Sequence, residues 1–128
     1  MNNLLFVYGT LLNGDNEFAI YLKNNSSFYL PGKVKGELYD AGDYPAAILT
    51  PQRDGYIYGD ILEINDPEKV LQVIDDYEGF GADQQQPNEF VRVAAEVETE
   101  WGLVICWVYT YNLPVGGLTL IENGKYKK

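Results

Sequence analysis

The sequence contains no histidine and a single cysteine, which narrows the chemistry open to the protein. Histidine is the usual general base near neutral pH, so acid–base catalysis has to use Asp, Glu, Lys or Tyr. Serine and cysteine triads that need histidine are excluded. We expect no metal site of the ordinary zinc type and no other cofactor. Cys106 cannot form an intramolecular disulfide, and its apolar surroundings in the sequence predict a buried, inert thiol.

Long hydrophobic runs and a basic N-terminal region are also missing. The longest apolar stretches, Leu4–Val7 and Trp101–Tyr109, are far shorter than the roughly 20 residues that span a bilayer. The N-terminus has no pattern of a secretory signal, so we expect a cytoplasmic protein. A net charge of −10 repels phosphate backbones and anionic lipid, so neither nucleic acid nor membrane is an expected partner. The sequence does not indicate an oligomeric state.

The 128 residues are 46% hydrophobic and 14% aromatic, enough for one packed domain over residues 1–128. We predict an α+β fold with a mixed or antiparallel, barrel-like sheet of five to seven strands and two main helices. The first helix follows Asp15, and the second starts at Asp66 and Pro67 and ends at Gly79. A turn is expected over Asn24–Ser27. The strands are expected at Leu4–Tyr8, Phe28–Tyr39 (as an edge or bent strand), Ala46–Leu49, Tyr56–Ile64, Phe90–Val97, Leu103–Tyr111 and Leu118–Ile121.

Glu78 is the first candidate for chemistry. At about 100° per residue, the apolar side of the second helix consists of Val70, Leu71, Val73, Ile74 and Tyr77. Glu78 falls between Ile74 and Leu71 on this wheel, whereas Asp75 and Asp76 fall outside the apolar arc. An inward carboxylate at a helix C-terminus should have a raised pKa, as suits a general base. Alternatively, the helix ends at Tyr77 and Glu78 turns into water.

A turn after the first strand is the second candidate. Tyr8, Gly9, Thr10 and Leu11 follow a buried strand, where consecutive backbone N–H groups can form an anion-binding nest. Gly9 permits the close approach of a ligand. The alternative is an ordinary glycine that ends a strand. No phosphate loop or dinucleotide fingerprint occurs, so a nucleotide is not expected.

Tyr44 and Arg92 complete the candidates. Tyr44 precedes Pro45 in a constrained turn that either closes a pocket or serves structure alone. Arg92 lies mid-strand and can bind a ligand carboxylate bidentately, although an ion pair with Glu96 or Asp75 is the interpretation that the sequence favours.

Together these segments resemble the gamma-glutamylcyclotransferase-like family, which includes gamma-glutamylamine cyclotransferases. The matching residues, in order, are Phe6–Leu11, Gly36–Tyr39, Tyr44, Pro45, Gly59, Ile74–Gly79, Arg92 and Ile121–Gly124. Two positions depart from the family's pattern: Phe90 stands where relatives often carry tyrosine, and Tyr126 replaces a frequent tryptophan.

The resemblance implies a small α+β barrel in which the turn Tyr8–Leu11 holds a gamma-glutamyl group through backbone atoms. It also implies that Glu78 is the catalytic acid/base, and it adds Tyr44 and Arg92 to the substrate-binding residues. The expected reaction is attack of the substrate's alpha-amine on its own gamma-glutamyl amide, which releases 5-oxoproline and a free amine or amino acid. The alternative is a non-catalytic module that binds another small molecule in the same pocket; a protein-interaction domain is a third, weaker one.

Overall fold

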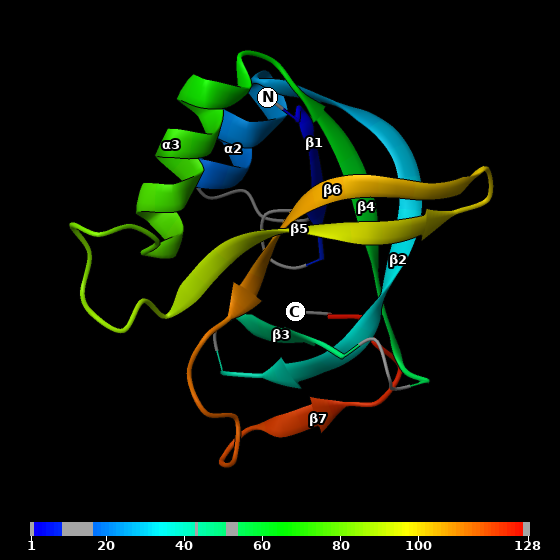
Figure 1. Cartoon of the computed structure of the whole chain (residues 1–128), viewed down its shortest axis with the longest axis vertical. Coiled ribbons are helices and arrows are strands. Elements are labelled where there is room, and N and C mark those ends of the chain that lie inside the picture. Colours follow the sequence, from blue (N-terminus) through cyan, green and yellow to red (C-terminus); the bar gives the residue numbers. More distant parts are fainter. Residues whose placement is uncertain (1, 9–16, 43, 51–53, 127–128) are drawn as a thin grey trace.

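The computed structural model describes residues 2–8, 17–42, 44–50 and 54–126. In this part of the chain, seven strands and two helices follow one another as shown in Figure 1. The elements, in chain order, are β1 (Leu4–Val7), α2 (Glu17–Asn24), β2 (Ser26–Asp40), β3 (Pro45–Leu49), β4 (Tyr56–Ile64), α3 (Pro67–Glu78), β5 (Phe90–Thr99), β6 (Gly102–Tyr111) and β7 (Thr119–Ile121). The predicted α+β class is therefore confirmed.

Five of the strands close into a barrel in the order β2, β4, β1, β6, β5. The closure is made by β5 returning to β2, where Lys33 lies opposite Glu98. The pairing of β1 with β6 is parallel, whereas the other pairings are antiparallel. β3 and β7 pair with the second half of β2, at the end of the molecule away from the helices (Figure 1). The long β2 is thus bent, as predicted, but it has neighbours on both sides and is not an edge.

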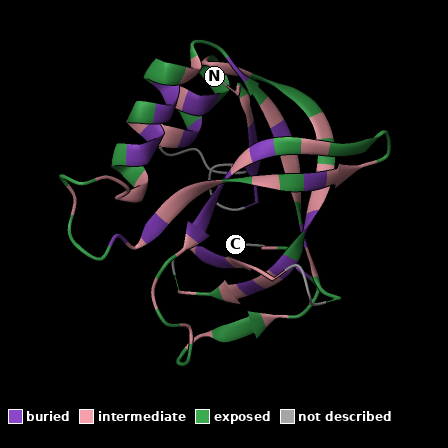
Figure 2. Cartoon of the chain, in the orientation of Figure 1, coloured by how far each residue is buried: buried purple, intermediate pink, exposed green. Residues whose placement is uncertain are grey.

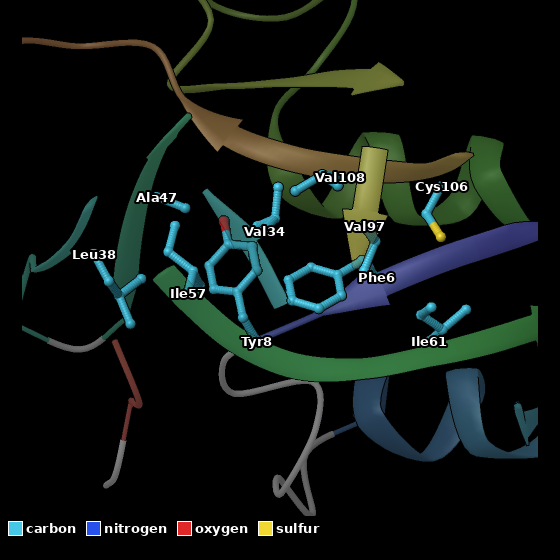
Figure 3. Close-up of a cluster of buried hydrophobic side chains, with 10 residues drawn as sticks. All are labelled: Phe6, Tyr8, Val34, Leu38, Ala47, Ile57, Ile61, Val97, Cys106 and Val108. Atoms are coloured by element: carbon cyan, nitrogen blue, oxygen red, sulfur yellow. The ribbon is translucent and has the colours of Figure 1, made fainter. Parts of the chain in front are cut away.

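The short strand β1 is buried on both faces and separates two hydrophobic clusters. Leu5 and Val7 point toward the helices, whereas Phe6 and the following Tyr8 point into the barrel. Alternate side chains of a strand face opposite sides of its sheet, so one apolar run serves both clusters. Figure 3 shows the barrel cluster, in which the rings of Phe6 and Tyr8 lie among aliphatic side chains from several strands. The end of β1 is therefore held rigidly between the two clusters.

The helices α2 and α3 cover one side of the barrel and pack side by side (Figure 1). Each contains both buried and exposed residues (Figure 2), and α2 buries Ala19 and Leu22. Phe18 of α2 stacks on Tyr77 of α3, with ring centroids 3.7 Å apart. The cap of α2 expected at Asp15 lies outside the described residues.

Three local details differ from the predictions, although α3 starts at Pro67 and ends at Gly79 as expected. Asp66 precedes α3, but its φ is 45° and its side chain makes no capping hydrogen bond, so Pro67 at the first helical position starts the helix instead. The turn expected at Asn24–Ser27 is shorter, because β2 begins at Ser26. The buried side of α3 is Val70, Leu71, Ile74 and Asp75, so the inward arc is rotated away from Val73 and Tyr77.

The prediction for Asp75 was wrong in the way that matters most for the site. Its side chain was expected in solvent, but Asp75 is only 8% exposed. Its carboxylate is buried because Arg92 reaches it from β5 and Tyr109 from β6. The observed buried side of α3 also changes the position of Glu78 relative to the core. On a wheel of about 100° per residue, Glu78 lies in the middle of the observed buried arc, between Ile74 and Leu71.

Gly59 in β4 was expected to mark a bulge or a close approach of backbones, and the structure shows the close approach. A Cβ at this position would lie 2.1 Å from the carbonyl oxygen of Val7 in β1. The register shift of this strand pair is elsewhere, between Phe28 and Leu30. The buried thiol expected at Cys106 is confirmed: it is fully buried, and burial raises its pKa to about 11. No helix in the described ranges has the length and apolar character needed to cross a membrane.

Candidate active site

A cavity of about 230 Å³ opens where the ends of several elements meet. β1 contributes its last residues, α3 its C-terminus, β3 and β5 their beginnings, and β6 one tyrosine. Its walls are mostly aromatic, with two carboxylates among them. The described residues that line it are Phe6, Val7, Tyr8, Tyr44, Pro45, Tyr77, Glu78, Glu89, Phe90 and Tyr109.

Glu78, the last residue of α3, brings one carboxylate to this cavity. It is placed there because α3 continues for its full length and ends only at Gly79, whose φ of 75° favours glycine. Burial, as the larger cause, and the negative charge of Glu89 together raise the pKa of Glu78 to about 7. A carboxyl group with this pKa can accept and return a proton near neutral pH. The alternative in which Glu78 turns into bulk water is therefore not what the structure shows.

Glu89 brings the second carboxylate and directly precedes β5. Its carbonyl oxygen accepts a hydrogen bond of 2.7 Å from the backbone N–H of Asn112. Its carboxylate accepts a hydrogen bond from the hydroxyl of Tyr44, whose ring packs edge-on against Phe90. The backbone and the side chain of Glu89 are thus both fixed at the cavity.

A chain of hydrogen bonds supports the opposite wall. The hydroxyl of Tyr8 donates to the carbonyl oxygen of Tyr109, whose own hydroxyl donates to Asp75 at 2.6 Å. Arg92 grips the same Asp75 with two nitrogens, Nε at 2.8 Å and Nη2 at 3.1 Å, and its guanidinium lies 4.4 Å from the centre of the Trp107 ring. Burial is the largest cause of the raised pKa of both Tyr8 and Tyr109. Both hydroxyls therefore remain protonated and act as donors.

The structure brings together three of the residues that the sequence singled out: Tyr8, Tyr44 and Glu78 all line the cavity. Arg92 does not; it forms the ion pair with Asp75 that was one of the two pairs considered. The expected turn residues Gly9, Thr10 and Leu11 lie outside the described residues.

Sequence reasoning missed Glu89, Phe90 and Tyr109 as parts of the cavity. Glu89 directly precedes Phe90, where the start of a strand was correctly predicted. Its position at the edge of the sheet was therefore the one hint in the sequence that it could reach a cavity. Nothing in the sequence showed that this rim faces the end of α3.

The described residues contain no group of three or more Cys, Asp or Glu side chains placed to hold a metal ion. What the cavity offers instead is one carboxyl group poised to titrate, a second carboxylate, and aromatic walls with hydroxyl groups. Such a site can move protons on a bound small molecule and can hold positive charge against rings and carboxylates.

Comparison with known families gives this geometry a context. Residues 5–128 match the family model described as gamma-glutamyl cyclotransferase, AIG2-like. The chain belongs to this family. The resemblance noted in the sequence is therefore confirmed over nearly its whole length.

Individual relatives of the AIG2-like family differ in length. The chain is 32% identical over 109 residues to gamma-L-glutamyl-butirosin B gamma-glutamyl cyclotransferase from Niallia circulans, which covers 84% of this chain and 66% of that protein. It is 30% identical over 129 residues to YkqA from Bacillus subtilis, but spans only 42% of the length of that protein. The match to the family protein YtfP from Escherichia coli (strain K12) is 27% over 129 residues and covers 94% of it.

Two solved structures share the fold of this chain. The crystal structure of YkqA superposes with a TM-score of 0.72 at 28% identity, over 98% of this chain and 40% of that one. An AIG2-like protein from Mus musculus superposes with a TM-score of 0.76 at 24% identity, over 98% and 88% of the two chains. The second likeness shows the fold alone.

Proposed function

We propose that the protein is a gamma-glutamyl cyclotransferase that converts a gamma-glutamyl amide into 5-oxoproline and a free amine. The observation that carries this proposal is the Glu78 carboxyl group, which lines the cavity and has a pKa of about 7. Membership of the AIG2-like family supports it. The Niallia circulans relative, by its name, is a gamma-glutamyl cyclotransferase that acts on gamma-L-glutamyl-butirosin B.

Substrate binding is assigned to the turn Tyr8–Leu11 and to the aromatic walls. The alpha-carboxylate of the gamma-glutamyl group would lie against the backbone N–H groups of Gly9, Thr10 and Leu11, because consecutive N–H groups that follow a strand can bind an anion. Tyr8 begins this turn, and its hydroxyl is held by the carbonyl oxygen of Tyr109. Tyr44, which directly precedes β3, would contact the substrate. Arg92 would act indirectly, by holding Asp75 and through it Tyr109.

Glu78 would move the protons. Its carboxylate removes a proton from the alpha-ammonium group, and the neutral amine attacks the delta-carbonyl carbon. A new carbon–nitrogen bond closes the five-membered ring. Glu78 returns its proton to the leaving nitrogen, the old amide bond breaks, and the freed carboxylate accepts the remaining proton from the ring nitrogen. The products are 5-oxoproline and the amine, and no cofactor enters the balance.

Positioning and proton transfer are the two contributions that the protein has to supply. Because the amine attacks a carbonyl group of its own molecule, holding the chain folded can lower the barrier by several kcal/mol. General acid–base catalysis by Glu78 would add about 10²- to 10⁴-fold.

The test is to incubate the protein with a panel of gamma-glutamyl amines and amino acids and to measure 5-oxoproline by mass spectrometry. We expect product with the unchanged protein and a loss of about 10²- to 10⁴-fold in kcat for Glu78→Gln. Asp76→Asn is the matched control, because Asp76 is exposed on the same helix. Full activity in Glu78→Gln would overturn the mechanism. No product with any substrate, while a panel compound still raises the Tm, would point to the binding module.

A further inference from the structure

Glu89 plays no part in the proton transfers, yet the structure fixes it at the cavity as firmly as Glu78. The backbone N–H of Asn112 holds its carbonyl oxygen, and the Asn112 side chain donates to the carbonyl oxygen of Asn88 at 2.9 Å. The Tyr44 hydroxyl holds its carboxylate. A carboxylate that is oriented by a neighbouring element and lines a cavity is placed to meet a ligand.

No positive side chain of the protein faces Glu89 in the described part of the chain. Among the described residues, the ion pair is formed by Arg92 and Asp75, and it does not involve Glu89. It occupies the Nε and Nη2 atoms of Arg92. The cavity lining among described residues contains neither lysine nor arginine. The sequence of residues 9–16, which follows Tyr8, contains no lysine or arginine either.

A bound gamma-glutamyl substrate would leave the negative charge of Glu89 without a positive partner. The gamma-glutamyl group carries one ammonium and one carboxylate, so it is neutral overall. Its ammonium is the group that Glu78 deprotonates, and it therefore cannot also neutralise Glu89. The negative charge of Glu89 disfavours the ionised form of Glu78, and it therefore raises the pKa of Glu78. A second cation on the substrate would remove this repulsion.

The walls of the cavity suit such a cation. Tyr44 and Phe90 pack edge to face beside Glu89, with ring centroids 5.8 Å apart. Aromatic faces attract ammonium groups, and they also contact the methylene groups of an alkyl amine. The combination of one carboxylate with several rings is the usual chemistry of a site for an alkylammonium group.

We infer that Glu89 determines specificity by binding a second ammonium group on the leaving amine, so that the preferred substrates are gamma-glutamyl amides of diamines. This inference rests on the proposed function, because it assigns the leaving-group side of the same cavity. It extends that function by naming the substrate class and the residue that selects it.

The experiment compares two sets of substrates that differ in one group. One set consists of the gamma-glutamyl amides of diaminopropane, diaminobutane and diaminopentane. In the other, a methyl group replaces each terminal ammonium. We expect kcat/KM to be about 10- to 100-fold higher for the charged member of at least one pair. In Glu89→Gln this preference should disappear, mainly through a higher KM for the charged substrate, while turnover of the alkyl amide persists.

Controls separate the local charge from the net charge. Glu96→Gln removes one negative charge from an exposed position of β5, the strand that follows Glu89, and it should keep the preference. Equal kcat/KM for both sets in the unchanged protein would overturn the inference. So would an equal loss for both sets in Glu89→Gln, because Glu89 would then be holding the alpha-ammonium that all these substrates share.

Binding measurements keep the inference testable without turnover. Calorimetry on Glu78→Gln should give a Kd about 10-fold or more lower for the charged amide than for its alkyl partner, and adding Glu89→Gln should remove the difference. If the unchanged protein releases no 5-oxoproline from either set, the proposed function fails. The affinities then decide about Glu89 alone, and equal affinities would refute its role.

Discussion

The pKa of Glu78 has two causes of unequal size, and the smaller one can be removed by mutation. Burial is the larger cause, and the charge of Glu89 is the second. Because the ionised form is the base, we expect kcat/KM to rise with pH, with a midpoint near pH 7, and to level off about one pH unit higher. Glu89→Gln should move the midpoint to lower pH, since less repulsion favours the ionised form.

The measurement is the pH profile of kcat/KM with an uncharged alkyl amide, so that any effect of Glu89 on a cationic leaving group is absent. Glu96→Gln serves as the control for net charge. A midpoint that stays in place or moves to higher pH in Glu89→Gln would contradict the electrostatic link between the two carboxylates.

Side-chain direction was predictable from the sequence for Glu78 but not for its neighbour Asp75. Helical spacing alone placed Glu78 between two apolar residues, and the structure agrees. The same spacing placed Asp75 outside the apolar arc. Its burial depends on Arg92 and Tyr109, which lie on strands far away in the sequence and supply the charge and the hydrogen bond that a buried carboxylate needs.

At the scale of elements, the ion pair of Asp75 and Arg92 fastens α3 to β5. The side chains are only 12% and 13% exposed, so removing one partner leaves a poorly solvated charge. We expect Arg92→Met to lower the free energy of unfolding by about 3 kcal/mol. Adding Asp75→Asn should recover part of this loss, because the amide carries no charge and still accepts the Tyr109 hydrogen bond. Urea unfolding of the single and double variants measures both effects.

Two outcomes would argue against this role of the pair. Additive losses in the double variant would show that the two side chains do not interact. A loss below about 0.5 kcal/mol in Arg92→Met would show that the pair behaves like an exposed one. Lys69→Met is a useful comparison, because Lys69 is exposed on α3 and forms no ion pair within the described residues.

Element positions followed from periodicity and turn residues, whereas the arrangement of the elements did not. The strand Leu4–Tyr8 was recognisable as buried on both faces, and Gly59 as a place where backbones approach. The closure of the barrel depends on Lys33 meeting Glu98, a contact between distant segments that leaves no local pattern. The sequence therefore predicted a barrel-like sheet, whereas the strand order came from the structure.

At the scale of the whole molecule, the absence of histidine allows the titration of Glu78 to be detected in the pH dependence of the free energy of unfolding. Few groups titrate between pH 6 and 8 in a chain without histidine, so the raised pKa of Glu78 should dominate proton uptake in this range. In the unfolded chain its pKa returns to an ordinary value near 4.5. The folded state therefore binds this proton more tightly, and stability should fall as pH rises from about 4.5 to about 7 and then stay level with respect to this group.

Glu78→Gln removes this penalty, so the variant should be more stable than the unchanged protein by about 1 to 3 kcal/mol at pH 8 and nearly equal to it at pH 4.5. Burial also raises the pKa of Asp60, but Asp60 is present in both proteins and cancels in the comparison. Urea unfolding of both proteins across this pH range gives the difference directly. A constant difference at every pH would mean that Glu78 does not titrate between the two limits. A variant that loses activity while gaining stability at high pH would show that the fold sacrifices stability to keep this carboxylate buried at the cavity.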